Sequence, residues 1–252
     1  MRSYPSRVIL GVPIAAITLS EISHLITNLI GSKRKKTFFY VNAYCLNIAN
    51  RDEKYKRILQ KAFLVYPGGF GPVLASKILG QPLPERTPTP DFIFDVLAIA
   101  KERKWSIYLL GGEEHVAKKA SEKLKEKFPN LLIVGYHSGH FTKREEKVII
   151  GQLNSKKPTI LLVGMGTPRQ EKWIAENIDN VDAKVFWAVG ALFDFISGRL
   201  KRAPFWMQRM GLEWLFRLFQ EPTRLWKRYL LGNIEFIYLV LKEALRKTGQ
   251  ER

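Results

Sequence analysis

The residues with the clearest potential for chemistry lie in one stretch, 158–171, which reads PTILLVGMGTPRQE. Its apolar half, 159–163, predicts a strand that is covered on both faces, as strands of a parallel sheet are. The glycine turn at 164–166 should lead into a helix that Thr167 caps and whose first turn holds Pro168. Free N–H groups and the positive end of the helix dipole meet at such a point, so the stretch predicts a phosphate site.

Three polar residues directly behind this turn favour a functional loop over a plain connection. A turn with only Gly164 and Gly166 also occurs in ordinary strand–helix connections. Arg169, Gln170 and Glu171 follow at once and add side chains that can contact a ligand. We therefore expect the turn and its polar neighbours to belong to a substrate site.

The elements that must position this loop alternate along the chain as strands and helices. Strands are predicted at 8–12, 37–41, 63–66, 106–110, 131–136, 159–163 and 184–189. Helical segments of about ten or more residues separate most of them. This alternation predicts an α/β, Rossmann-like fold with a mostly parallel, doubly wound sheet.

Ligands of such sheets bind beyond the carboxyl ends of the strands. The loops expected at that edge are rich in glycine and polar residues, namely Asn42, Gly68 to Gly71, Gly111, Gly112, His137 to His140, Gly164 to Gln170 and Gly190 to Asp194. One of them, 67–72, holds so much glycine and proline that it predicts a loop with no regular structure. The convergence of these loops predicts a site of nucleotide size.

The charge of the chain bounds its partners. The formal net charge is +18 at pH 7, from 41 basic and 23 acidic residues, and such a field attracts nucleic acid, anionic membranes or phosphorylated substrates. No helix-turn-helix, RNP or zinc pattern accompanies the charge, so nucleic acid is the least favoured partner. The lone cysteine, Cys45, excludes a disulfide framework and a zinc site built from cysteines. No metal site is expected, although His137 and His140 are close enough in sequence to share an ion.

The C-terminal part differs in amino-acid composition from the rest of the chain. Residues 199–252 carry twelve basic and five acidic residues, interleaved with aromatic ones, and Pro204 and Pro222 divide the segment into short helices. Helices that are basic on one face and rich in Trp, Phe and Leu on the other lie in a membrane interface. The alternative is a tail whose aromatic residues complete the core. We divide the chain into a core, 1–198, and a helical membrane-docking appendage, 199–252.

No segment reaches the roughly 20 consecutive apolar residues that a spanning helix needs. The run 8–19 follows basic residues, as the core of a signal peptide does, but Pro13 and the helix start at Ser20 favour a strand that leads into a helix. We expect a cytoplasmic protein that binds peripherally to the inner face of the cell membrane.

Taken in order, several motifs resemble the WecG/TagA/CpsF family of bacterial glycosyltransferases over nearly the whole chain. The motifs are Asn42-Ala43, the glycine loop at 68–71, Leu110-Gly111-Gly112, Val163 to Gly166 with Pro168 to Glu171, Arg202-Ala203-Pro204, Gly211 to Trp214 and Glu221-Pro222-x-Arg224. The resemblance implies a Rossmann-like core that moves a sugar from a UDP-sugar to a polyprenyl-diphosphate-linked sugar, for cell-wall or exopolysaccharide synthesis. It implies inversion at the anomeric carbon, no metal or other cofactor, and docking on an anionic membrane. A homo-oligomer is left open.

The resemblance also assigns roles to individual residues. Asn42 lies near the acceptor, Arg86 lies toward the diphosphate, and Gln170 and Asp194 line the nucleotide-sugar pocket. The substrate-binding set is Gly68, Gly69, Arg86, Gly111, Gly112, His140, Gly164, Gly166, Gln170, Glu171 and Asp194. The residues expected to meet the lipid diphosphate or the membrane are Arg202, Arg217, Arg224, Lys227 and Arg228. Three of these arginines, at 217, 224 and 228, should share one helix face because they are seven and four residues apart.

The sequence departs from the family pattern at the expected general base. The family usually has an aspartate where this chain has Gly68, and a threonine is common where this chain has Tyr40. His140 stands where a tyrosine is often found. Asp91 is the nearest carboxylate in sequence that could replace the base, although a role as a helix N-cap explains it without chemistry. We assign the catalytic set to Asn42, Gln170 and Asp91. The alternative is a catalytically silent member that binds a sugar nucleotide or a lipid diphosphate.

Overall fold

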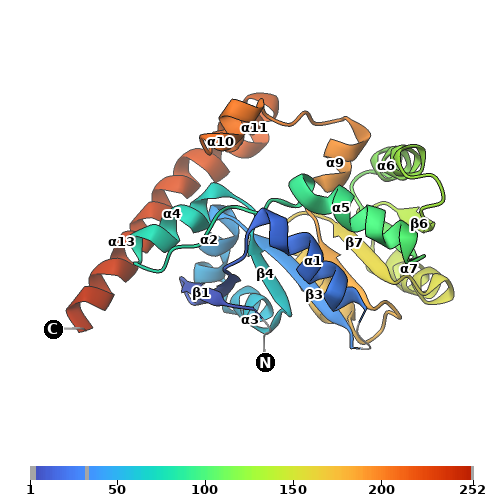
Figure 1. Ribbon diagram of the computed structural model, residues 1–252, viewed down its shortest axis with the longest axis horizontal. Coiled ribbons are helices and arrows are strands. Elements are labelled where there is room, and N and C mark those ends of the chain that lie inside the picture. The colour runs from blue at the N-terminus through green and yellow to red at the C-terminus, as the bar shows by residue number, and fades with distance from the viewer. Residues whose placement is uncertain (1–3, 32–33, 251–252) are drawn as a thin grey trace.

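Six parallel strands form the central sheet of the computed structural model, which describes residues 4–31 and 34–250 (Figure 1). The strand order is β4-β3-β8-β7-β5-β6. The strands are β3 (Lys36–Val41), β4 (Leu64–Pro67), β5 (Ile107–Gly111), β6 (Ile133–His137), β7 (Ile160–Gly164) and β8 (Val185–Ala188). Each neighbouring pair is parallel, so all six carboxyl ends lie along one edge. The predicted Rossmann-like fold class is confirmed.

Side chains alternate between the two faces of the sheet and fill two separate cores. In β7, Leu161 and Val163 belong to one core, whereas Ile160 and Leu162 belong to the other. The helices packed in the first core are α2 (Ala43–Arg51), α3 (Glu53–Lys61), α4 (Phe70–Ile78), α7 (Lys143–Lys156) and α8 (Arg169–Asn177). Those of the second are α1 (Leu19–Ile30), α5 (Thr89–Glu102), α6 (Glu114–Lys127) and α9 (Leu192–Ser197). Burial on both faces explains why these strands are apolar throughout.

The first predicted strand, 8–12, is wrong. The segment is a hairpin in which β1 (Ser6–Ile9) pairs antiparallel with β2 (Val12–Ala15), outside the main sheet. Leu10 and Gly11 form its turn with φ angles of 48° and 77°, as a two-residue turn with both φ positive requires. Leucine is uncommon at a position with positive φ, so the apolar run 8–12 gives no sign of a turn.

The C-terminal segment is helical, as predicted, and part of it completes the core. It comprises α10 (Phe205–Arg209), α11 (Glu213–Gln220), α12 (Pro222–Trp226), the π-helical turn η1 (Lys227–Leu231) and α13 (Gly232–Gln250). Figure 1 shows α13 running beside α2 and α4. Phe236 and Val240 of α13 are fully or almost fully buried in the first core, and Glu243 accepts a hydrogen bond of 3.0 Å from the backbone N–H of Leu10. The boundary at residue 198 stays a prediction, but α13 is attached to the core by these contacts.

In the two described ranges, none of the helices combines the length and the apolar character that crossing a bilayer demands.

Candidate active site

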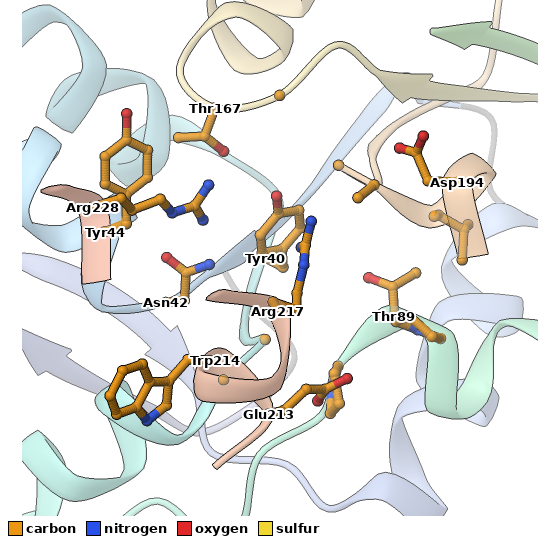
Figure 2. Close-up of a pocket in the computed structure, with 18 of the residues that line it drawn as sticks. Tyr40, Asn42, Tyr44, Thr89, Thr167, Asp194, Glu213, Trp214, Arg217 and Arg228 are labelled. Atoms are coloured by element: carbon orange, nitrogen blue, oxygen red, sulfur yellow. The ribbon is translucent and has the colours of Figure 1, made fainter. Parts of the chain in front are cut away.

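A cavity of about 680 Å³ lies between the carboxyl edge of the sheet and the C-terminal helices. Its walls come from the loops after the strands and from α11, α12, η1 and α13. Figure 2 shows Tyr40 near the middle of this cavity, with Asn42 and Asp194 on different sides of it. Small-molecule pockets measure about 300–1,000 Å³, so the cavity is large enough for a nucleotide sugar.

Asn42 is fixed where β3 ends. It is the N-cap of α2, with extended backbone, and its Oδ1 atom accepts a hydrogen bond of 3.1 Å from the backbone N–H of Cys45. Asparagine is among the preferred residues at this position because its side chain satisfies a free N–H of the first turn. The cap holds the side chain at the cavity wall, where its amide nitrogen is the remaining hydrogen-bond donor.

Gly68 and Gly69 pack directly against Tyr40 and Asn42. A Cβ atom at Gly68 would lie 2.9 Å from both Cβ and Cδ2 of Tyr40, and one at Gly69 would lie 3.2 Å from Cβ of Asn42. Gly69 is also the N-cap of α4, so the second half of the loop predicted at 67–72 is helical. The two departures from the family pattern, at positions 40 and 68, are therefore in contact. The ring of Tyr40 fills the space that a side chain at position 68 would enter.

Two arginines and two carboxylates join the core to the appendage beside the cavity. Arg202 donates hydrogen bonds of 2.6 Å to Asp91 and to Glu213, and Arg86 lies 3.4 Å from Asp91 and 3.6 Å from Glu213. Arg202 also donates to Gln208 at 2.8 Å. Arg86 and Glu213 line the cavity, whereas Asp91 and Arg202 do not. The network holds α11 against the start of α5.

Asp91 differs in position from the sequence-based expectation. It lies in the first turn of α5, which begins at Thr89 after Pro88, so it is not the N-cap. Both of its oxygens face arginines, since Arg202 contacts one and Arg86 the other. Asp91 therefore holds the two arginines in place.

The glycines of the predicted substrate-binding set fall into two groups. Gly111 does not line the cavity, and a Cβ atom there would collide with the carbonyl group of Gly164 on the neighbouring strand. Gly112, Gly164 and Gly166 do line it, as does the exposed side chain of His140. Gly166 has a φ of 77° and no atom within 4 Å of the place where a Cβ would stand. That turn leaves open space in front of its backbone, as the sequence predicts for a ligand-binding loop.

The predicted cap of α8 is wrong. The helix begins at Arg169 after Pro168, and no side chain caps it. The hydroxyl of Thr167, a residue joined to Pro168 by a cis peptide bond, instead donates a hydrogen bond of 2.9 Å to Oε1 of Glu171. Thr167 remains in the cavity wall while its hydroxyl is directed at a buried carboxyl group.

Gln170 and Glu171 are both 0% exposed and do not line the cavity. Nε2 of Gln170 donates to Oε1 of Glu171 at 2.8 Å, and Oε1 of Gln170 accepts from the backbone N–H of Gly190 at 3.1 Å. Gln170 thereby fixes the loop after β8 from below. Burial raises the pKa of Glu171 to about 7, against the opposing effect of its hydrogen bonds.

Asp194 lines the cavity from the first turn of α9. Burial raises the pKa of this carboxyl group, and Arg199, which donates to its Oδ1 atom at 3.1 Å, acts in the opposite direction. Arg199 lies equally close, at 3.1 Å, to Glu113. The pair therefore places a carboxyl group and a guanidinium group together at this end of the cavity.

Three arginines of the appendage also line the cavity, and Arg217 lies 5.4 Å from the ring centre of Phe195, the residue after Asp194. Arg217 and Arg224 donate to Glu221 at 3.1 Å and 2.9 Å, and the guanidinium of Arg228 lies 4.1 Å from the centre of the Tyr44 ring. All five residues line the cavity. Partial burial acts to raise the pKa of Glu221, but the two arginines outweigh it and hold the pKa below its usual value.

Arginine dominates the ionisable lining of the cavity. In the part of the chain that the structure describes, six arginines (at 86, 169, 199, 217, 224 and 228) and four carboxylates (at 113, 194, 213 and 221) line it. Lys227 is exposed, lies 5.4 Å from the ring of Trp226, and is not part of the lining. No three His, Cys, Asp or Glu side chains within 4–31 and 34–250 gather in a way that could hold a metal ion.

The sequence profile of the "Glycosyl transferase WecG/TagA/CpsF family" matches residues 7–250. The chain belongs to this family. The WecG/TagA/CpsF resemblance seen in the motifs is thus confirmed, and with it the prediction that the protein is a glycosyltransferase.

Two curated relatives of this WecG/TagA/CpsF member carry the same name. A protein of Bacillus subtilis (strain 168) is 32% identical over 90% of this chain and 88% of its own length. One of Staphylococcus aureus (strain MRSA252) is 28% identical over 97% and 95%. Both are named N-acetylglucosaminyldiphosphoundecaprenol N-acetyl-beta-D-mannosaminyltransferase. Each relative is therefore named as a transferase that acts on a lipid-diphosphate sugar.

Several residues of the cavity in this WecG/TagA/CpsF member escaped the sequence analysis. Tyr44 follows Asn42 by two residues and supports Arg228, and Arg199 pairs with Asp194. Glu213 was noted only as part of a motif, and its pairing with Arg202 depends on contacts between residues far apart in the sequence. Such pairings leave no local pattern in the sequence.

Proposed function

We propose that this WecG/TagA/CpsF member is an inverting glycosyltransferase whose donor is a UDP-sugar and whose acceptor is a polyprenyl-diphosphate-linked sugar. From the names of its relatives, we propose N-acetylmannosamine as the transferred sugar and N-acetylglucosaminyl-diphospho-undecaprenol as the acceptor. The main support for this proposal is that the sheet loops and the appendage line the same cavity. Loops of the sheet supply a nucleotide-sized site, and the appendage adds a cluster of arginines that can meet a second diphosphate.

On the donor side, the open turn at Gly166 and the loop from Gly190 to Asp194 face the cavity from neighbouring strands. Backbone N–H groups in such loops can bind the diphosphate of UDP and stabilise the charge that develops on it as the bond to the sugar breaks. Arg86 lies at the same cavity and adds a guanidinium group that can bind phosphate oxygens in pairs. Displacement is direct, so the anomeric carbon inverts.

On the acceptor side, Arg217 and Arg224 share the carboxylate of Glu221, and Arg228 lies over the ring of Tyr44 instead. The three arginines and one carboxylate leave this part of the cavity with a net positive charge. The Nε atoms of Arg217 and Arg228 are buried and have no hydrogen-bond partner among the described residues. Such donors suit a phosphate that arrives with the lipid. We therefore propose that arginines, rather than a metal ion, neutralise both diphosphates, and that transfer continues in EDTA.

We further propose that the appendage docks on the cytoplasmic face of the membrane. On α13, Ile234, Tyr238, Leu241 and Leu245 are 49% to 75% exposed and are spaced by four, three and four residues, which places them on one helix face. Phe219, Leu230 and Leu231 are also exposed in the preceding helices. An exposed apolar face beside basic residues suits an anionic lipid surface.

Flotation with vesicles tests the docking. Ile234→Asp/Leu245→Asp should reduce binding to vesicles that contain phosphatidylglycerol, because it places charge in the apolar face. The matched control is Val148→Asp, since Val148 is 61% exposed on α7, away from the appendage. Equal binding by the two variants, or binding that ignores the charge of the lipid, would contradict the docking proposal.

Binding of the donor has a separate test. UDP should raise the melting temperature of the purified protein by several degrees at a concentration ~100 times its Kd, since that excess stabilises by about 2.7 kcal/mol. The rise should be the same in EDTA. No shift with millimolar UDP would count against the donor site.

One observation favours a second candidate, a silent member that binds its ligands without transfer. Each of the four carboxylates that line the cavity is paired with arginine, so none of them is a free general base. The two candidates differ in one measurement, the formation of product from UDP-N-acetylmannosamine and a synthetic polyprenyl-diphosphate N-acetylglucosamine.

A further inference from the structure

A transfer reaction at this cavity needs an acceptor for the proton of the attacking hydroxyl group. General-base assistance accelerates such steps by about 10² to 10⁴-fold. Each carboxylate in the wall is already paired with an arginine. The structure contains a different route from the cavity to a carboxyl group.

Tyr40 is the first group on that route. Its ring lies against Gly68, and its hydroxyl lies against Gly190, where a Cβ atom would collide with the hydroxyl oxygen. Figure 2 shows the hydroxyl directed toward the side of the cavity on which Thr167 lies. Two glycines thus leave room for a tyrosine in the wall of the cavity, and a larger residue at either place would displace it.

Thr167 connects the tyrosine with a buried carboxyl group. Burial and the nearby Glu171 raise the pKa of Tyr40, whereas Arg228 and a hydrogen bond with Thr167 act in the opposite direction. Thr167 in turn donates to Oε1 of Glu171 at 2.9 Å. Because the Thr167 hydroxyl gives its one proton to Glu171, its oxygen is left to accept from a donor on its other side, such as the Tyr40 hydroxyl. A proton can therefore move in one direction along these groups, from Tyr40 through Thr167 to Glu171.

Glu171, the last of these three groups, has a carboxyl oxygen that can accept a proton. Its Oε2 atom is buried and has no hydrogen-bond partner among the described residues, and its carboxyl group is 0% exposed. A buried polar atom without a partner costs about 1–3 kcal/mol, so the arrangement needs a reason. No arginine or lysine forms an ion pair with Glu171 in the described part of the chain, unlike the carboxylates of the wall.

The other groups that face Glu171 do not compete for the proton near neutral pH. Tyr40 faces it from β3, Cys45 from α2, Tyr55 from α3 and Arg228 from η1. Burial raises the pKa of the Cys45 thiol to about 11 and also raises that of Tyr55. Glu171 is the member of this group that changes its protonation near pH 7.

We propose that Tyr40, Thr167 and Glu171 form a proton relay that serves as the general base of transfer, with Tyr40 in contact with the acceptor hydroxyl group. The relay rests on the proposed function, because it acts only if the cavity transfers a sugar. Tyr40 is then a catalytic residue, and Thr167 and Glu171 act through it.

The proton and electron balance of the step is complete within these groups. The acceptor oxygen forms a bond to the anomeric carbon, and the bond from that carbon to UDP breaks, with its electron pair leaving on UDP. The acceptor proton passes to the oxygen of Tyr40, whose own proton passes to Thr167, and the proton of Thr167 passes to the carboxylate of Glu171. After UDP leaves, the proton returns to water along the same chain.

Kinetics of full-length variants test the relay, with UDP-N-acetylmannosamine and a polyprenyl-diphosphate N-acetylglucosamine as substrates. Tyr40→Phe and Glu171→Gln should lower kcat about 10² to 10⁴-fold with little change in the KM of UDP-sugar. The kcat of the wild type should fall as pH drops below about 7, and Glu171→Gln should lose that limb. Thr167→Val should behave like the other two, whereas Thr167→Ser, which keeps the hydroxyl group, should restore most of the rate.

Tyr108→Phe is the matched control, because Tyr108 is a buried tyrosine whose hydroxyl donates to the carbonyl group of Tyr136, outside the cavity lining. Binding of UDP to each variant shows that it is folded. Transfer by the wild type together with unchanged kcat and pH profile in Tyr40→Phe and Glu171→Gln would overturn the relay and leave the proposed function intact. Absence of transfer by the wild type would overturn both.

Discussion

Gly68 and Tyr40 permit a double-mutant cycle in which one substitution should change the sign of its effect on stability. In the wild type, the added methyl group of Gly68→Ala would lie 2.9 Å from Cβ and Cδ2 of Tyr40, close to the backbone and not at the flexible end of the side chain. Overpacking of this kind costs about 1–3 kcal/mol. The φ angle of Gly68 is not in the left-handed region, so alanine loses no backbone fit there.

In the background of Tyr40→Thr, the ring that opposes the methyl group is gone. Gly68→Ala should then stabilise the protein by about 0.4–1 kcal/mol, because alanine restricts the unfolded chain more than glycine does. The interaction energy of the cycle should therefore be about 2 kcal/mol, well beyond the limit for independent sites, which is about 0.5 kcal/mol.

Urea denaturation followed by tryptophan fluorescence measures the four free energies of unfolding. Gly151→Ala provides the matched control, since Gly151 lies within α7 with no atom within 4 Å of its Cβ position. That substitution should stabilise both backgrounds equally, by about 0.5–1 kcal/mol. Equal effects of Gly68→Ala in both backgrounds would refute the claim that Tyr40 occupies the space in front of position 68.

Three further predictions concern stability. Because burial raises the pKa of Glu171 to about 7, the folded state binds a proton more tightly than the unfolded state, so stability should fall by roughly 3 kcal/mol as pH rises from 4.5 to 7. Glu171→Gln should lack this loss in thermal unfolding across pH, and an unchanged slope would contradict the assignment. Phe236→Ala should lower the free energy of unfolding by about 3–5 kcal/mol, whereas Ile234→Ala, at a site 71% exposed, should lower it by less than about 0.5 kcal/mol. Similar midpoints of urea denaturation for the two variants would show that α13 is not part of the core. Arg202→Lys should lower the melting temperature nearly as much as Arg202→Ala, because one ammonium group cannot replace a guanidinium that bonds two carboxylates, and full recovery by lysine would contradict that geometry.

Much of the fold could be predicted from the sequence because its signals are local. Apolar runs mark the six strands of the sheet, and the polar or glycine-rich loops behind them do lie along one edge. The hairpin at Leu10 and Gly11 could not be predicted in the same way. A leucine with positive φ looks, in sequence, like part of the strand on either side of it.

The site was predictable in its composition but not in its pairings. The spacing of Arg217, Arg224 and Arg228 indicates one face, and the three do meet at the cavity. The burial of Gln170 and Glu171 could not be foreseen, since polar residues behind a glycine turn suggest exposure to a ligand. The contact between Tyr40 of β3 and Gly68, the residue after β4, needs the sheet order to be known.

Formation of product by the unmodified protein tests the central claim most directly. The wild type would be incubated in EDTA with UDP-N-acetylmannosamine and a synthetic polyprenyl-diphosphate N-acetylglucosamine, and the lipid would be analysed by mass spectrometry. We expect a lipid that is heavier by one N-acetylhexosamine residue, in a β linkage, and one UDP released for each product. Binding of UDP without any extended lipid, for this donor and for other UDP-sugars, would contradict the account and leave a binding protein in its place.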